Sequence, residues 1–412
     1  MEFKTAKLKN GLEIVAECDD AAFSTALGFF VNTGARDETD EVSGVSHFLE
    51  HMVFKGTPSR SAEDVNREFD EMGAHYNAFT NEENTVYYAA VLPEYLPSTV
   101  RLLADLMRPS LRVEDFDTEK KVILEEIKMY DDQPPFGVDE KCRAAFFGNH
   151  PLSRSVLGTA ASVGALNADQ MRQYFERRYS PRNIVLVGSG RIDFSQLCET
   201  AEQCCGSWPT VEEGRPLPPA VPQAGFHVVC KDTAAQEYAI MMCSGPTASD
   251  ADRYAAKILA TVLGDDSGSR LYWELVDPGM AEHCSLHHHE YLNAGMFLTY
   301  MSCDPEYAAE NLKRIAGIYQ NAIAKGITQA ELDQAKNKIN SRVVLGSERP
   351  RGRLFNVGAN WVQRREYRSV RNDLDAVEAI TLKDVAAVQQ KYPLTQPTTF
   401  VVGPLAEISS AA

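Results

Sequence analysis

The sequence lacks several features that would assign it at once to a functional class. Across its 412 residues, no apolar run approaches the roughly 18 residues that suggest a membrane span. Positive charge is scarce: 41 Lys and Arg stand against 58 Asp and Glu, for a formal net charge of −17. Nucleic-acid binding needs a basic surface. We therefore expect a soluble protein whose partners are neither membranes nor nucleic acids.

The cysteines also lack a pattern. There are nine of them, an odd number without regular spacing, and neither Cys198 nor the Cys204-Cys205 pair forms a Cys-x-x-Cys motif. A disulfide scaffold and a zinc knuckle are therefore not expected. The first residues lack the apolar core and the small-residue cleavage site of a secretory signal. We predict reduced, mostly buried thiols and a cytoplasmic protein.

A metal-site pattern is present in the stretch from Gly44 to Thr57, GVSHFLEHMVFKGT. Residues three and four apart share a face of a helix, so His47 and His51 point the same way with Glu50 beside them. Zinc binds neutral imidazoles, and a catalytic zinc keeps one open position beside three protein ligands. The order His-x-x-Glu-His is the inverzincin signature. The plainer alternative is a core helix with two hydrogen-bonded histidines.

A third ligand is available on a helix predicted from Glu114 to Tyr130. This helix carries Glu119, Glu125 and Glu126. Seven residues are close to two helical turns, so Glu119 and Glu126 share a face. An acidic cluster on a helix is usually a solvated surface, and the residues alone favour Glu126 over Glu125 only slightly.

The other elements predicted before residue 209 follow from periodicity and from turn and cap signals. A histidine in the predicted hairpin, His75, is more often structural than a metal ligand. The predicted elements are strands over Lys7–Ala16 and Ser24–Asn32, a helix capped by Ser61 and ending at Gly73, a hairpin over 74–92 with its turn at 81–84, helices over 94–108 and 167–178, and a loop followed by a buried strand over 179–190.

The second part of the chain repeats this order. A helix from Thr381 and a strand over 398–403 resemble the pair over 167–190, and a helix containing Glu331 resembles the one containing Glu119. The equivalent of the histidine helix, Arg253 to Gly264, is apolar. Five prolines lie in the stretch between the copies. The predicted divisions are a zinc-bearing half, a linker and a metal-free half, at residues 1–208, 209–225 and 226–412.

Three stretches together resemble a known family. They are HFLEHMVFKGT at 47–57, NAFTNEENTVYY at 77–88 and EKKVILEE at 119–126. The chain resembles the pitrilysin (insulinase) family of zinc metallopeptidases, in particular the shorter members related to the mitochondrial processing peptidase subunits. The resemblance implies Zn²⁺ as cofactor. It also implies an α+β fold of two homologous halves, each a mainly antiparallel sheet covered by helices.

The resemblance assigns roles to individual residues. It implies Glu126 as the third zinc ligand beside His47 and His51, Glu50 as the general base and Glu119 as a supporting acid of the site. An edge strand would bind an extended substrate by main-chain hydrogen bonds. Its residues here are Ala78, Phe79 and Thr80. Glu83 is a candidate to orient a ligand histidine from outside the ligand set.

One departure from the family concerns substrate binding. Active members carry an arginine and a tyrosine after a Ser-Arg-Leu segment of the metal-free half. Here Val276 or Asp277 and Glu282 stand at those positions. Arg270 and Tyr272 are the candidates to substitute for them. The triple from His287 to His289 alternates faces on a strand, so its three side chains cannot all bind one ion.

The expected function is a zinc endopeptidase that cleaves short or unfolded polypeptides. Four halves enclose the family's substrate chamber and this chain supplies two, so a homodimer or a heterodimer with a related subunit is expected. Two alternatives remain open. The chain is the catalytic subunit of a pair whose partner carries the arginine and tyrosine, or it is a non-peptidase structural subunit like the related core subunits of respiratory complexes.

Overall fold

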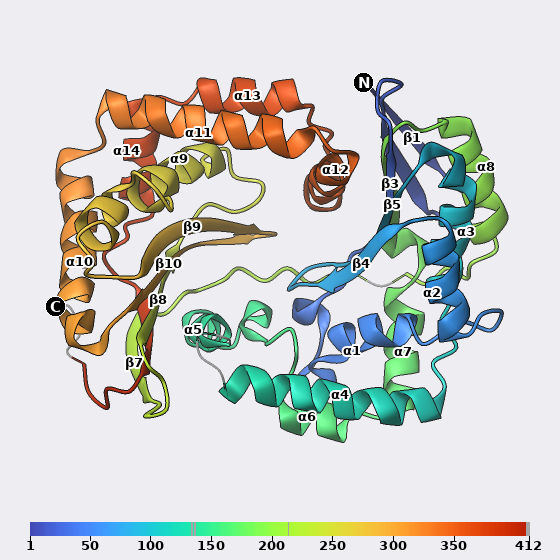
Figure 1. The fold of residues 1–412 in the computed structure, drawn as a ribbon, viewed down its shortest axis with the longest axis horizontal. Helices are drawn as coiled ribbons and strands as arrows, with labels where there is room; N and C mark the ends of the chain where they lie inside the picture. Colours follow the sequence, from blue (N-terminus) through green and yellow to red (C-terminus); the bar gives the residue numbers. More distant parts are fainter. Residues whose placement is uncertain (133–134, 136, 213, 409–412) are drawn as a thin grey trace. The chain divides into compact units, whose positions relative to one another are not determined.

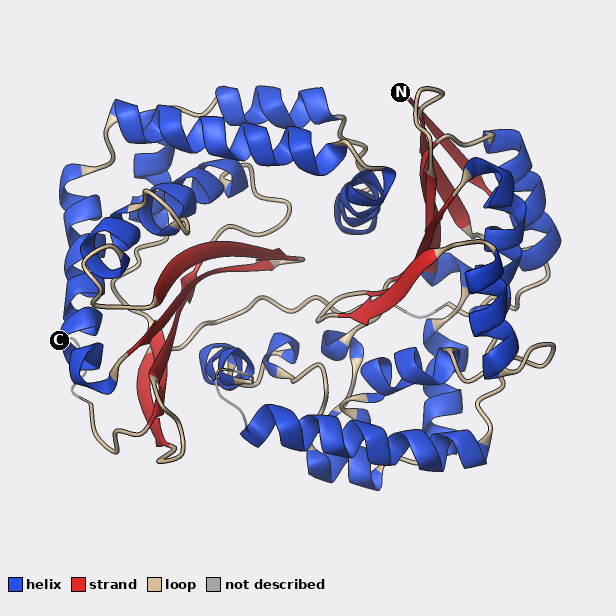
Figure 2. Ribbon diagram, in the orientation of Figure 1, coloured by secondary structure: helices blue, strands red, loops and turns tan. Residues whose placement is uncertain are grey.

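The computed structural model describes residues 1–132, 135, 137–212 and 214–408. The chain folds into two compact units. Each unit contains one sheet with helices packed against it, as Figures 1 and 2 show. The predicted α+β class with two similar halves is therefore confirmed.

Each unit is assembled from three segments of the chain. The first unit comprises residues 1–128, 154–216 and 346–368, and the second comprises residues 129–153, 217–345 and 369–412. The predicted division into homologous halves at residues 209–225 stays a prediction. The two compact units group residues that pack together, whereas homologous halves are defined by similarity of sequence. Residue 213 of the predicted linker and residues 409–412 of the predicted second half lie outside the described residues.

The sheet of the first unit has the strand order β1-β2-β6-β3-β5-β4. Neighbouring strands are antiparallel except β2 and β6, which are parallel. Strand β4 lies at one edge, so one side of its backbone is not paired within the sheet. The strands are β1 (Glu2–Lys7), β2 (Glu13–Cys18), β3 (Thr25–Val31), β4 (His75–Thr80), β5 (Thr85–Val91) and β6 (Ile184–Gly190).

The sheet of the second unit has the order β7-β11-β8-β10-β9. If β1 is left out, the five remaining strands of the first sheet have the same arrangement. The first two strands are parallel in each sheet, β2 and β6 in the first and β7 and β11 in the second, and the other neighbours are antiparallel. The duplication predicted from the sequence is therefore present in the topology. The strands are β7 (Gly225–Cys230), β8 (Glu237–Ser244), β9 (His283–Tyr291), β10 (Ala294–Cys303) and β11 (Thr398–Gly403).

Helices cover both faces of the first sheet. Leu354 and Val357 of α12 pack against Val15, Phe30 and Val185 on one face, while α3 and α8 contact the strands from the other face. The predicted capping box of α2 is confirmed, since Ser61 and Asp64 exchange hydrogen bonds. The helices are α1 (Val45–Val53), α2 (Ala62–Glu71), α3 (Leu96–Leu106), α4 (Val113–Asp132), α6 (Ala160–Ala165), α7 (Ala168–Arg178), α8 (Phe194–Cys205) and α12 (Pro350–Arg364).

The second sheet is covered in the same way, with α5 taking the place that α12 has in the first unit. Cys142 and Phe146 of α5 pack against Ile240, Met242 and Val402 of the strands. The helices are α5 (Val138–Phe147), α9 (Arg253–Gly264), α10 (Ala308–Lys325), α11 (Gln329–Ser347), α13 (Val370–Glu378) and α14 (Leu382–Lys391). Short 3₁₀ turns occur at Ala35–Asp37, Asp40–Val42, Pro93–Tyr95, Pro151–Ser153, Pro181–Asn183 and Pro305–Tyr307, and a π-turn at Tyr272–Val276.

The first predicted strand, Lys7–Ala16, is wrong as a single strand. Strand β1 ends at Lys7 and β2 begins at Glu13, with a turn between them. Gly11 has a φ of +96°, which favours glycine, and its N–H donates to the carbonyl of Leu8 at 2.9 Å. Alternating side chains continue across the turn, so periodicity alone does not reveal it.

None of the helices in the described part of the chain combines the length and apolar character needed to cross a bilayer.

Candidate metal centre

Helix α1, which carries both histidines of the motif, is held at its N-terminus by a carboxylate from outside the helix. Glu38 accepts the N–H of Gly44 at 2.7 Å and that of Ser46 at 2.8 Å. These N–H groups have no partner within a helix. Glu38 is buried, and burial raises its pKa to about 8 although the hydrogen bonds oppose the shift. Val45 and Phe48 fix the buried side of α1.

The structure brings His47, His51 and Glu126 together. The Nε2 atoms of both histidines lie 3.9 Å from Oε2 of Glu126. One candidate ligand atom from each residue falls within 4.8 Å of the others, which no other trio of His, Cys, Asp or Glu among the described residues achieves. Tetrahedral zinc with bonds of about 2.0–2.2 Å spaces its ligands by roughly 3.4 Å. A small contraction would close the group around an ion.

Protonation in this group suits metal binding. Burial, with a smaller effect of His51, lowers the pKa of His47 to about 3, so its imidazole is neutral at physiological pH. The neutral imidazole is the form that binds metal. Burial also raises the pKa of Glu126, with His51 opposing and Glu119 adding to the shift. The donor set and the neutral His47 imidazole fit a zinc ion, whereas the raised pKa of Glu126 favours its protonated form, from which a metal would displace the proton.

Glu119 lies behind His51 and orients its ring. Its Oε1 is 2.9 Å from Nδ1 of His51, and its Oε2 is 2.5 Å from Nζ of Lys55. Burial raises the pKa of Glu119, but the hydrogen bonds from Lys55 and His51 outweigh it and the net pKa is lowered. A carboxylate in this position fixes a ligand histidine's tautomer and strengthens it as a donor.

Two other predicted acids lie away from the group. Glu125, the alternative third ligand, is exposed on α4. Glu83, the candidate to orient a ligand histidine, instead pairs with Arg36 in a buried ion pair. The contact to a histidine ring comes from Glu119 of α4, which packs beside α1, whereas Glu83 lies in the turn of the β4–β5 hairpin.

Glu50 connects the group to the edge of the first sheet. The hydroxyl of Thr80 donates to Oε2 of Glu50 at 2.6 Å. Burial raises the pKa of Glu50, while the Thr80 hydrogen bond and His51 lower it in part. Ala78, Phe79 and Thr80 lie on β4, the predicted edge strand. The backbone of an edge strand therefore passes beside the carboxylate.

A buried polar network supports α1 from below, and sequence reasoning missed it. The hydroxyl of Tyr174 is 2.8 Å from that of Ser46 and 2.6 Å from that of Thr33. Arg178 donates to Thr33 and pairs with Asp37 at 2.6 Å. The polar loop before α1 was the available signal, but it does not indicate which of its acids turn inward.

The candidates for substrate binding in the second half lie in the second unit. Arg270 makes a bidentate pair with Glu331, at 2.7 and 2.9 Å, and also donates to the carbonyl of Gly326. Tyr272 begins the π-turn. Glu282 accepts a hydrogen bond from Gln236. Substrate binding by Arg270 and Tyr272 stays a prediction.

The remaining histidines and the cysteines have structural contacts. His75 lies on β4 beside Arg351. The triple histidine lies on edge strand β9, where His288 is 2.9 Å from the carbonyl oxygen of Pro246. All nine cysteines are free.

Comparisons with known proteins show to which family this duplicated α+β chain belongs. The family model described as Insulinase (Peptidase family M16) matches residues 13–160, and the Peptidase M16 inactive domain matches residues 165–339. An uncharacterized zinc protease of Mycobacterium tuberculosis is 33% identical over an alignment of 408 positions that covers 96% of this chain and 92% of the relative. The chain therefore belongs to the insulinase family, peptidase family M16.

Solved structures share the fold at lower identity. A protease from Helicobacter pylori aligns with a TM-score of 0.91 at 22% identity, over 97% of this chain and 99% of that one. A chain of complex III from Candida albicans aligns with a TM-score of 0.85 at 17% identity, over 98% of this chain and 96% of that one. Because a protease and a chain of complex III share the fold, the function has to be argued from the site.

Proposed function

We propose that this chain is a zinc-dependent endopeptidase that cleaves short or unfolded polypeptides. The observation that carries the proposal is the convergence of His47, His51 and Glu126, with Glu50 hydrogen-bonded to an unpaired sheet edge. The relative from Mycobacterium tuberculosis is named a zinc protease. A non-peptidase subunit of the same fold would not need this donor set beside a sheet edge.

His47, His51 and Glu126 would hold the zinc. When bound, zinc lowers the pKa of a coordinated water towards about 7 and polarises the scissile carbonyl. Glu50 accepts a proton at its carboxylate and returns it to the nitrogen of the leaving amine. The Thr80 hydroxyl binds Oε2 of Glu50, which leaves Oε1 to take the proton. Glu119 keeps the His51 ring in place.

The substrate would add to β4 as a further strand. Main-chain groups of Ala78, Phe79 and Thr80 would bind the substrate backbone, because an edge strand offers unpaired N–H and C=O groups. This mode depends little on side chains, so it suits varied sequences. It requires an extended peptide, which explains the preference for short or unfolded chains.

Metal analysis of purified protein tests the zinc assignment. We expect about one zinc per chain in the native protein, and strong loss in His51→Ala and Glu126→Gln. Glu125→Gln is the matched control, since it removes the neighbouring exposed carboxylate of the same helix. Unchanged zinc content in His51→Ala, with the fold intact by circular dichroism, would show that the assignment is wrong.

We further propose that the active form is a homodimer or a heterodimer with a related subunit. The family's chamber has four halves and this chain supplies two, which supports either dimer. Arg270 is bound by Glu331, and Glu282 stands where the family has a tyrosine, which supports a related subunit that supplies the substrate clamp. The test measures the mass in solution and peptide hydrolysis, with and without a related chain. A monomer that turns over at about 1–10³ per second and gains nothing from a partner would contradict this.

We also propose a cytoplasmic location, because nine free cysteines fit a reducing compartment. Cell fractionation with an antibody to the chain tests it. Recovery in an oxidising, extracytoplasmic fraction would contradict the proposal.

A further inference from the structure

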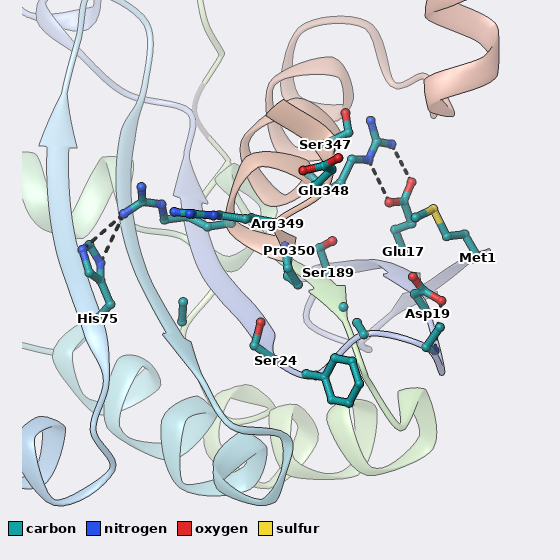
Figure 3. A pocket seen from close by; sticks show the side chains of 17 residues that line it. Met1, Glu17, Asp19, Ser24, His75, Ser189, Ser347, Glu348, Arg349 and Pro350 are labelled. Atoms are coloured by element: carbon teal, nitrogen blue, oxygen red, sulfur yellow. Dashed lines mark hydrogen bonds and ion pairs between the residues drawn. The ribbon is translucent and has the colours of Figure 1, made fainter. Parts of the chain in front are cut away.

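A pocket of about 530 Å³ lies in the first unit, away from the metal centre and beside the edge strand (Figure 3). It is lined by the start of α12, by the loop that precedes β3 and by His75 of β4. In Figure 3, the side chain of Arg349 extends towards the strand that carries His75, while Asp19 lies at the opposite end. The pocket therefore has a basic end next to β4.

Three arginines at the start of α12 line this pocket, and only one is neutralised by a carboxylate. Arg353 donates to both carboxylate oxygens of Glu17, at 2.8 and 2.5 Å. Arg351 is 3.3 Å from Nε2 of His75. For Arg349 and Arg351 the described residues provide no ion pair. These two arginines thus line one pocket together with Asp19 and Glu348, neither of which pairs with them, in a protein whose formal net charge is −17.

The position of these arginines in α12 adds to the positive potential. Arg349 is the N-cap residue without a side-chain cap hydrogen bond, and the first turn contains no acidic residue. Cations at a helix N-terminus are unfavourable because the helix dipole is positive there. An anion would be stabilised by the helix end and by both guanidinium groups. Acidic residues more than about 8 Å away weaken this attraction little, because their charges are screened at physiological salt.

The basic end of the pocket lies on the path that a bound peptide would follow. Thr80 contacts Glu50, and His75 lies five residues away on the same strand, which is about 17 Å at 3.3–3.4 Å per residue. His75 and Phe79 project from the same side of β4. Phe79 contacts Phe355 of α12, so this side of β4 faces α12.

We infer that Arg349, Arg351 and His75 form a specificity subsite for a carboxylate of the substrate, about five residues from the scissile bond. This inference rests on the proposed peptidase function. The carboxylate belongs either to an Asp or Glu side chain or to the C-terminus of the peptide. Arginine binds carboxylates through two parallel N–H donors, so both sources fit the same groups.

A set of matched peptides tests the subsite. Each peptide has one Glu, placed three to seven residues from the cleavage site on either side, and a partner with Gln at that position. We expect kcat/KM to be about fivefold to tenfold higher for Glu than for Gln at one position near the fifth residue, because partly exposed charged hydrogen bonds give effects of this size. Peptides that end there, with a free or an amidated C-terminus, separate the two sources of the carboxylate.

The double variant Arg349→Gln/Arg351→Gln should lose the preference, so that kcat/KM for the Glu peptide falls to the value for the Gln peptide. Arg67→Gln, which removes an exposed positive charge on α2, is the control and should retain the preference. Arg351→Lys should keep part of it, since the charge remains and the bidentate donor is lost. A preference that is absent in the native protein, or that persists in the double variant, would overturn the subsite.

A binding measurement separates failure of the subsite from failure of the peptidase function. Fluorescence anisotropy with Glu50→Gln protein compares the Kd of labelled Glu and Gln peptides without cleavage. We expect the Glu peptide to bind about fivefold to tenfold more tightly, with the difference shrinking as salt rises. Equal Kd values would overturn the subsite even if the native protein cleaves peptides. A difference in Kd, together with a native protein that cleaves none of the peptides, would support the anion site and contradict the peptidase proposal.

Discussion

The first and second units share a strand order but differ in the helix that follows their central strand. In the first unit this helix is α1, whose half-buried positions hold His47, Glu50 and His51. In the second it is α9, which buries Ala256, Ile258 and Leu259 completely. Gly264 at the end of α9 lies so close to β9 that a Cβ atom there would be 2.3 Å from the N atom of Leu286.

The two helices are held in place by different interactions. Helix α9 contributes apolar surface to its core, which stabilises the unit at about 25 cal/mol per Å² buried. Helix α1 keeps His47 and His51 partly exposed beside Glu126 of α4, with side-chain exposures of 12, 27 and 26%. Its position is fixed instead by a hydrogen bond from the Gly44 N–H to Glu38 and by one between the hydroxyls of Ser46 and Tyr174. One copy therefore presents the candidate metal ligands, and the other contributes its helix to the core.

The strongest way to break this comparison is to replace one polar residue on each helix. Glu50→Gln in α1 should lower peptidase activity by at least about 10²- to 10⁴-fold with zinc retained, because the amide cannot accept the proton. Lys257→Gln in α9 removes an exposed partner of Glu290 and should change activity little. Peptide hydrolysis with host proteases excluded is the measurement. Near-native cleavage by Glu50→Gln would refute the proposed chemistry.

The next largest effect concerns packing in the metal-free half. Leu259→Ala should destabilise the second unit by about 2–5 kcal/mol, because Leu259 is fully buried and its removal leaves a cavity. Zinc content should be unchanged while the protein is folded. Urea unfolding and hydrogen exchange of α9 and β9 measure the effect, and Val344→Ala at a site that is 41% exposed is the control. Loss of zinc from folded Leu259→Ala would contradict the division of roles.

Local signals in the sequence predicted the elements that carry the candidate site. The period of α1, the cap at Ser61 and the hairpin turn at 81–84 all act within a few residues, and all three elements formed as expected. The repeat of helix and strand predicted the common topology. The meeting of His47, His51 and Glu126 followed from helical spacing and from the family pattern, and the structure places them together.

Contacts between distant segments could not be predicted in this way. The pairing of Arg353 with Glu17 joins residues far apart in the chain and places α12 on the first sheet. Similarly, α5 packs on the second sheet although it belongs to the first half of the sequence. Glu38 was one acid among several in a polar loop. Which acid turns inward depends on the tertiary structure, as does the choice of Glu119 over Glu83 beside His51.

The smallest effect tests whether Arg270 belongs to the packing of the metal-free half or to substrate binding. Arg270 lowers the pKa of Glu331 to about 2, from an ordinary value of 4.5, with burial opposing and Thr328 assisting. A lowered pKa means that the unfolded state binds the proton more tightly, so the stabilisation is present above pH 4.5 and is lost as the pH falls towards 2.

Glu331→Gln should therefore destabilise the second unit by about 1 kcal/mol at pH 7, a value reduced for solvent screening because the Glu331 side chain is 28% exposed. The difference from the native protein should vanish towards pH 2–3, as urea unfolding across this range can show. Glu310→Gln, in an exposed pair with Arg314, is the control and should show less. The KM for peptides should stay unchanged if Arg270 only packs against α11. A changed KM at pH 7, with stability differing as expected, would instead identify Arg270 as a substrate-binding residue that Glu331 positions.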